Sequence, residues 1–191
     1  MSFILNALIF LVTAFLIFRA CRKGGKWDRA ECRAAFRYFT VQSNAFCAFS
    51  ALLMCTAPAS RFVWMLKYVG TAAVTVTLFT VFLFLAPSLG SLRPLLKGDN
   101  LFMHLLTPLA AIVSFCFFEK RGLSFVSALW GMLPVVLYGL LYLYKIIYAP
   151  ADRRWEDFYG FNKGGKWPAA FITMMAGAFA VCMELTALQN L

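Results

Sequence analysis

Two polar side chains inside apolar stretches of this chain could carry out nucleophilic or acid–base chemistry. His104 is the only histidine. A neutral imidazole exchanges protons near pH 7, so His104 is either a general base or an interfacial side chain bonded to a backbone carbonyl. We favour the general base. The histidine stands near the start of an apolar run, in the segment Asn100-Leu-Phe-Met-His104-Leu-Leu-Thr107-Pro108.

A second polar group opens another apolar run. Thr40, Ser43 and Asn44 are spaced i, i+3 and i+4, so in a helix they share one face. Taken alone, Thr40 is more simply explained as a capping or back-bonding hydroxyl. A threonine hydroxyl beside an imidazole is, however, the minimum nucleophilic pair. Ser43 and Asn44 are then candidates for positioning the hydroxyl, an oxyanion or the substrate.

Composition places these residues in a membrane. The 191 residues are 62% hydrophobic and only 14% charged, whereas soluble domains have about 25% charged residues. A chain this apolar needs lipid as its solvent, and the alternation typical of a membrane β-barrel is absent. We therefore predict an all-α fold, a single six-helix transmembrane domain over residues 1–191. The expected spans are 2–19, 38–57, 68–86, 101–118, 123–144 and 167–188.

The basic residues predict the orientation of these spans. Seven, two and five of them lie in the first, third and fifth loops, and four lie in the second and fourth. Because cytoplasmic loops carry the excess of Lys and Arg, we expect loops one, three and five in the cytoplasm and both termini outside. The net charge of +10 then reflects membrane anchoring and not nucleic-acid binding.

Helix direction brings the two candidate residues to the same depth. The second and fourth spans run the same way, and Thr40 and His104 stand three and four residues after Arg37 and Asn100. Both are expected about 5–6 Å below the cytoplasmic boundary. Six cysteines without CxxC or Cys/His ligand spacing give no support for a metal, and we expect no cofactor.

The fifth loop could form a lid on the same side. Its aromatic side chains, including Trp155 and Tyr159, suit the membrane interface and could help position a substrate. One of its acids could orient His104, although pairing with Arg153 and Arg154 is the simpler role. Glu184, near the outer end of the last span, is left out of the expected site. The acids of the loop are Asp152, Glu156 and Asp157.

The order of these segments resembles the androgen-induced and androgen-dependent integral-membrane hydrolases, which cleave fatty-acid esters of hydroxy fatty acids. Thr40 with Asn44 is similar to the family's threonine segment, and Met103-His104 to its M-H-x-x-x-x-P pattern, with Pro108 one residue early. Trp155 to Phe158 is similar to its W-x-Y-P-F loop without the proline. A GG-x-W segment, Gly24-Gly25-Lys26-Trp27, also precedes an early span.

Uncharacterised bacterial six-span proteins with Y-F-T-x-x-S-N and H-x-x-x-P segments are similar too. The resemblance implies that Thr40 is the nucleophile and His104 the base of a lipid ester hydrolase. Its partners would be membrane lipids or fatty-acid esters. The alternative is a non-enzymatic protein, which could be a small transporter, a lipid-binding protein or a scaffold.

Overall fold

The computed structural model describes all residues from Met1 to Leu191. Six of its helical segments are long and apolar enough to cross a membrane. Their outward side chains include large apolar groups such as Phe3, Leu8 and Phe62, which suit a lipid environment. The predicted all-α fold is confirmed, and the chain is a multi-pass integral membrane protein. The segments are Ser2–Ala20, Phe39–Thr56, Arg61–Leu89, Asp99–Phe118, Phe125–Tyr148 and Trp167–Asn190.

The first, second and sixth spans are single helices, while the third, fourth and fifth are built from several helical pieces. The first half of the chain forms α1 (Ser2–Ala20), β1 (Arg22–Lys23), β2 (Lys26–Trp27), α2 (Arg29–Ala35), α3 (Phe39–Thr56), α4 (Arg61–Thr80), η1 (Val81–Leu85), α5 (Ala86–Leu89) and η2 (Arg93–Leu96). The fourth span consists of α6 (Asp99–Leu101), η3 (Phe102–Leu106), α7 (Thr107–Val113) and η4 (Ser114–Phe118). The remainder forms α8 (Phe125–Leu129), η5 (Trp130–Met132), α9 (Leu133–Leu143), η6 (Tyr144–Tyr148), η7 (Ala151–Arg153), η8 (Lys163–Gly165) and α10 (Trp167–Asn190).

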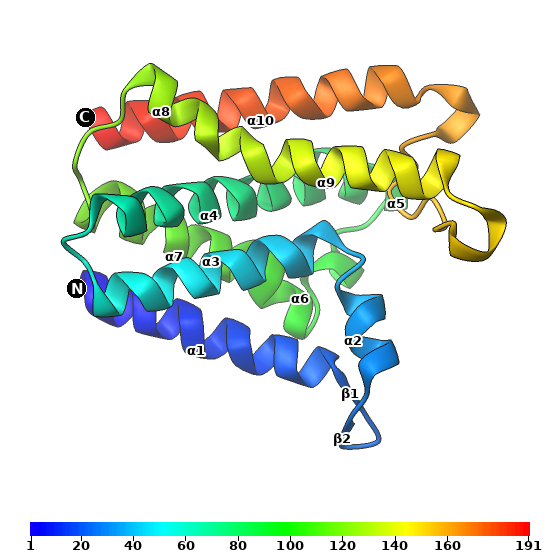
Figure 1. Ribbon diagram of the computed structural model, residues 1–191, viewed down its shortest axis with the longest axis horizontal. Helices are drawn as coiled ribbons and strands as arrows, with labels where there is room; N and C mark the ends of the chain where they lie inside the picture. Colours follow the sequence, from blue (N-terminus) through cyan, green and yellow to red (C-terminus); the bar gives the residue numbers. More distant parts are fainter.

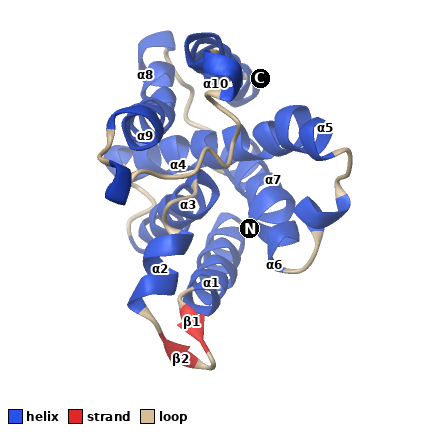
Figure 2. Cartoon of the chain, turned by 90° about the vertical axis from the view of Figure 1, so that its right-hand side faces the viewer, coloured by secondary structure: helices blue, strands red, loops and turns tan.

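The helices lie side by side with α4 at the centre. Figure 1 shows α1 and α3 on one side of α4 and α9 and α10 on the other, and Figure 2 shows the same arrangement end-on. Fourteen of the twenty residues of α4 are buried. Both termini lie at one end of the bundle, which we call the terminal face (Figure 1). The opposite end carries the connections 21–38, 90–98 and 149–166, and we call it the loop face.

The third span begins seven residues earlier than the sequence predicts. Ser60 caps α4 by accepting a hydrogen bond from the backbone N–H of Val63 at 3.3 Å. Lys67, which we expected in a loop, is fully buried inside this helix. The prediction was wrong here because two basic residues, Arg61 and Lys67, interrupt the apolar pattern. The fifth span also continues past residue 144, to Tyr148.

Close packing of α3 against α4 fixes the frame of the candidate site. A Cβ atom on Gly70 of α4 would lie 2.8 Å from Ser50 Oγ and 3.0 Å from Cys47 Cα, both on α3. Small residues allow membrane helices to approach this closely. Closer to the loop face than this contact, Ser43 of α3 lies against Thr77 of α4, and their hydroxyl oxygens are 2.9 Å apart.

Candidate functional site

The structure brings Thr40 and His104 together. Thr40 is the second residue of α3, and His104 lies in η3 of the fourth span. Thr40 Oγ1 lies 3.5 Å from His104 Nε2. This is longer than an ordinary hydrogen bond, but catalytic contacts commonly tighten only when substrate binds.

The other ring nitrogen fixes the tautomer of His104. Nδ1 lies 2.7 Å from the backbone carbonyl oxygen of Leu95, and a carbonyl oxygen only accepts hydrogen bonds. Nδ1 therefore carries the proton, and Nε2 presents a lone pair to Thr40. Leu95 belongs to the short helix η2 in the third loop. A backbone carbonyl, and not an acid of the fifth loop, orients the imidazole.

The proline after His104 explains the local helix geometry. Pro108 has no N–H and cannot donate to the carbonyl of His104, four residues earlier. The helix here widens into a π-helix, in which the Thr107 N–H donates to the Phe102 carbonyl, five residues earlier. Such π segments occur frequently at functional sites. The H-x-x-x-P spacing read from the sequence therefore coincides with an irregular turn that carries the histidine.

Asn44 joins the two helices immediately behind the pair. Its Nδ2 donates to the carbonyl of Thr40 at 2.8 Å and to that of Met103 at 3.0 Å. Ser43 Oγ donates to the same Thr40 carbonyl at 3.1 Å. Both side chains are buried and neither lines the cavity described below. Their contacts hold the backbone of Thr40 and Met103.

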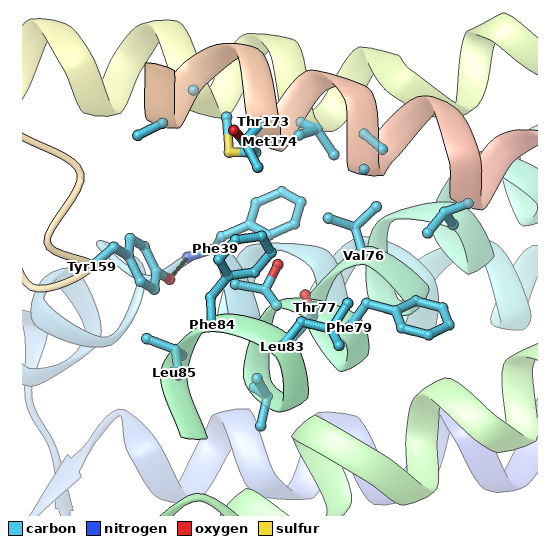
Figure 3. Close-up of a pocket in the computed structure, with 18 of the residues that line it drawn as sticks. Phe39, Val76, Thr77, Phe79, Leu83, Phe84, Leu85, Tyr159, Thr173 and Met174 are labelled. Carbon is cyan, nitrogen blue, oxygen red and sulfur yellow. Dashed lines mark hydrogen bonds between the residues drawn. The ribbon is translucent and has the colours of Figure 1, made fainter. Parts of the chain in front are cut away.

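A cavity of about 480 Å³ starts at Thr40 and is lined mostly by apolar side chains. Thr40 and Tyr159 lie at the loop-face end of its wall, and Glu184 of α10 is the lining residue nearest to the terminal face. His104 is not part of the wall and stands behind Thr40. Figure 3 labels ten of the residues that line the cavity, which are Phe39, Val76, Thr77, Phe79, Leu83, Phe84, Leu85, Tyr159, Thr173 and Met174.

Tyr159 closes the loop-face end of this cavity. Its hydroxyl oxygen accepts a hydrogen bond from the backbone N–H of Phe39 at 3.1 Å, the dashed line in Figure 3. Burial raises the pKa of the Tyr159 phenol, and the hydrogen bond from the Phe39 N–H opposes that rise. The neutral phenol keeps its own proton, which is available for an acceptor near Thr40.

A network centred on one tyrosine and one acid holds the fifth loop over the site. Tyr142 of α9 donates to Asp157 Oδ1 at 2.9 Å and accepts from the Tyr159 N–H at 3.1 Å. The Asp157 carboxylate also accepts from the N–H groups of Phe161 and Asn162, both at 2.7 Å. Asp157 therefore shapes the loop, which we did not expect from the sequence.

Other loop residues have supporting positions. Trp155 does not line the cavity; its ring packs 6.3 Å from that of Tyr142, with Lys145 Nζ 5.7 Å from the Trp155 centroid. Arg153 Nε lies 3.5 Å from Asp152 Oδ2, so this acid of the fifth loop pairs with an arginine of the loop, as we expected. Glu184, which we left out of the site, belongs to the cavity wall.

A second polar cluster is buried on the terminal-face side of the bundle. Glu119 Oε1 accepts hydrogen bonds from Ser2 Oγ at 2.7 Å, Ser114 Oγ at 2.8 Å and Asn6 Nδ2. Glu119, which directly follows the fourth span, is buried, and Lys67 is fully buried inside the third span; the sequence reading missed both. Glu119 immediately follows an apolar run and Lys67 precedes one, so both resembled loop residues.

Comparison with known proteins gives no assignment, since no protein-family model, no curated protein and no solved structure matches this chain.

Proposed function

We propose that this chain is an intramembrane hydrolase of lipid esters, with Thr40 as nucleophile and His104 as general base. The observation that carries the proposal is the 3.5 Å approach of Thr40 Oγ1 to a ring nitrogen whose lone pair is free. The Leu95 carbonyl holds the other nitrogen in its protonated form. A hydroxyl next to an oriented base is the arrangement that activates a threonine nucleophile.

The reaction needs two steps and no cofactor. His104 Nε2 takes the proton of the Thr40 hydroxyl while Oγ1 attacks the ester carbonyl carbon. Collapse of the tetrahedral intermediate breaks the ester C–O bond, and His104 returns the proton to the leaving alcohol. A water molecule, deprotonated by His104, then attacks the acyl-threonine, the bond from the acyl carbon to Oγ1 breaks, and His104 returns the proton to Oγ1. The products are a free acid and an alcohol.

Tyr159 is the best-placed donor for the negative oxygen of the intermediate. Its oxygen already accepts from the Phe39 N–H, so its proton is free to point into the cavity that it shares with Thr40. Preorganised donors of this kind contribute a large share of acyl-transfer catalysis. Ser43 and Asn44 support the same step by holding the Thr40 backbone.

The apolar cavity supports a lipid as the substrate. Its wall is mostly hydrophobic and begins at the nucleophile, near one end of the membrane-spanning bundle. An ester group at the level of Thr40 would have its acyl chain in the cavity and its polar end near the loop face. The resemblance to fatty-acid ester hydrolases predicts the same pair of residues.

A fluorophosphonate probe tests the proposal directly, because it forms a covalent bond with an activated hydroxyl. Purified protein should be labelled, Thr40→Ala should abolish the labelling, and His104→Ala should slow it strongly. Thr173→Ala is the matched control, since Thr173 lines the same cavity but lies on α10. Labelling that survives Thr40→Ala removes Thr40 as the nucleophile.

A lipid-binding protein without turnover is the second candidate, because the cavity alone would suit a bound lipid. Such a protein binds lipid equally well in the wild type and in Thr40→Ala, and it releases no product. Measuring ester cleavage and lipid binding on the same two preparations separates the two functions.

We also propose that the loop face lies in the cytoplasm. Its three connections hold the excess of Lys and Arg, and the finding that Lys67 is buried removes one of the four positive charges counted for the other side. The positive-inside rule therefore favours this orientation more strongly than the sequence count does.

A further inference from the structure

The cavity extends from Thr40 along one face of α10. Its lining on this helix runs from Ala170 to Glu184, and fourteen residues at the helical rise cover about 21 Å. One leaflet of a bilayer contributes about 15 Å of hydrocarbon, half of the whole core. The cavity is therefore long enough to hold one complete acyl chain of a membrane lipid.

The volume of the cavity limits its width. About 480 Å³ over that length leaves a cross-section of about 23 Å². This is close to the square of the roughly 4.8 Å that separates neighbouring extended chains in a sheet. The cavity is therefore wide enough for an extended acyl chain along this length.

The charges of the wall select the end of that chain. No lysine or arginine lines the cavity, and Glu184 is its one acidic residue. A carboxylate at the far end of a bound chain would meet the Glu184 carboxylate, and like charges repel each other. A methyl end meets no such penalty.

Gly177 stands halfway along the channel. It lines the cavity seven residues from Ala170 and seven from Glu184, and a Cβ atom added to it would meet no other atom within 4 Å. A larger side chain at this position projects into open space without disturbing the helix packing. By contrast, Gly139 lines the cavity with Met174 Cε only 2.7 Å from its Cβ position.

We infer that the cavity is an acyl-chain channel that takes one long, straight chain with an uncharged end, and that Gly177 sets the permitted chain length. The inference rests on the proposed function for the position of the ester carbonyl at Thr40. It adds the substrate class, which is an ester of a long unbranched acyl chain whose far end carries no carboxylate.

Chain-length selectivity is the first test. Nitrophenyl esters with acyl chains from butanoyl to octadecanoyl are hydrolysed by the wild type and by Gly177→Leu. The variant should lose at least about tenfold in kcat/KM for hexadecanoyl ester, the effect of roughly two methylene groups leaving an apolar site, and keep its rate on butanoyl ester. Ala176→Leu is the matched control, because Ala176 is exposed and outside the channel. Equal losses at all lengths, or none, overturn the channel.

Glu184→Gln tests the selection of the chain end. The wild type should have a lower kcat/KM for an ester whose acyl chain ends in a carboxylate than for the matching methyl-ended ester. In Glu184→Gln the kcat/KM for the carboxylate-ended ester should rise at least about tenfold, because the like-charge repulsion is removed. Discrimination unchanged in Glu184→Gln overturns the role assigned to Glu184.

A photoreactive hexadecanoyl ester with a diazirine at the chain end separates the channel from the hydrolase. Bound to Thr40→Ala, it should crosslink to the α10 peptide around Glu184. Crosslinking there without hydrolysis by the wild type retains the channel and rejects the enzyme. Hydrolysis with crosslinks elsewhere retains the enzyme and rejects the channel.

Discussion

Thr40 Oγ1 lies 3.5 Å from His104 Nε2, where the beginning of α3 meets the π-helical segment η3. The two residues are separated by 64 positions in the sequence, and two connections fix their approach. The Leu95 carbonyl turns the imidazole at 2.7 Å, and Asn44 ties the Thr40 backbone to that of Met103, the neighbour of His104.

The rate of fluorophosphonate labelling should rise with pH and reach a plateau. Only the neutral His104 imidazole can take the Thr40 proton, so labelling is lost as the pH falls through the pKa of this group. His104→Ala should lower the rate by about 10²–10⁴-fold and remove this inflection. Labelling measured across the pH range checks both. A wild-type rate that does not change with pH contradicts the assignment of His104 as the base.

Tyr159→Phe should lower kcat for ester hydrolysis by about 10²–10³-fold, because a donor to the negative oxygen is lost, while KM changes little. Tyr148→Phe is a suitable control, since Tyr148 is an exposed tyrosine outside the cavity wall. Steady-state kinetics of the three proteins provide the measurement. A rise in KM with unchanged kcat would instead assign Tyr159 to ground-state binding.

Asn44→Ala should destabilise the fold and slow the reaction together. The substitution leaves the carbonyls of Thr40 and Met103 without their shared donor in a buried place, at a cost of about 1–3 kcal/mol. Thermal unfolding in detergent and the labelling rate are compared with those of Gln42→Ala, whose side chain makes an exposed hydrogen bond to the Phe36 carbonyl. If Asn44→Ala labels at the wild-type rate, the bridge does not position the nucleophile.

Glu119→Ala should lower stability by about 3 kcal/mol. The hydroxyls of Ser2 and Ser114 and the Asn6 amide lose their common acceptor in a buried place. Glu156→Ala is the control, because Glu156 is an exposed acid of the fifth loop. Thermal unfolding of the two variants should differ clearly, and equal midpoints would show that the cluster contributes nothing.

Cysteine labelling should place the loop face in the cytoplasm. Cys21 is fully buried, so it is a poor reporter, and exposed positions such as Ser91 and Ala59 serve better in a cysteine-free background. An impermeant maleimide added to intact cells should label Ala59→Cys on the terminal face and leave Ser91→Cys unmodified until the cells are opened. The reverse pattern would invert the proposed orientation.

The sequence by itself determined the number of membrane spans, their approximate positions and the common depth of Thr40 and His104. Hydropathy reports the length of each apolar segment, and alternating helix directions bring the beginnings of the second and fourth spans to one face. Where charged residues interrupt the apolar pattern the reading was wrong, as at Lys67, because only packing reveals that this side chain is buried inside α4.

Only the tertiary structure decided which side chains meet. The approach of α3 to η3, the Tyr159 contact with Phe39 and the path of the cavity along α10 depend on how six apolar helices pack, and hydropathy does not distinguish one lipid-compatible arrangement from another. The partner that orients His104 is a backbone carbonyl, that of Leu95. A carbonyl is present at every residue, so no side-chain pattern in the sequence could have identified it.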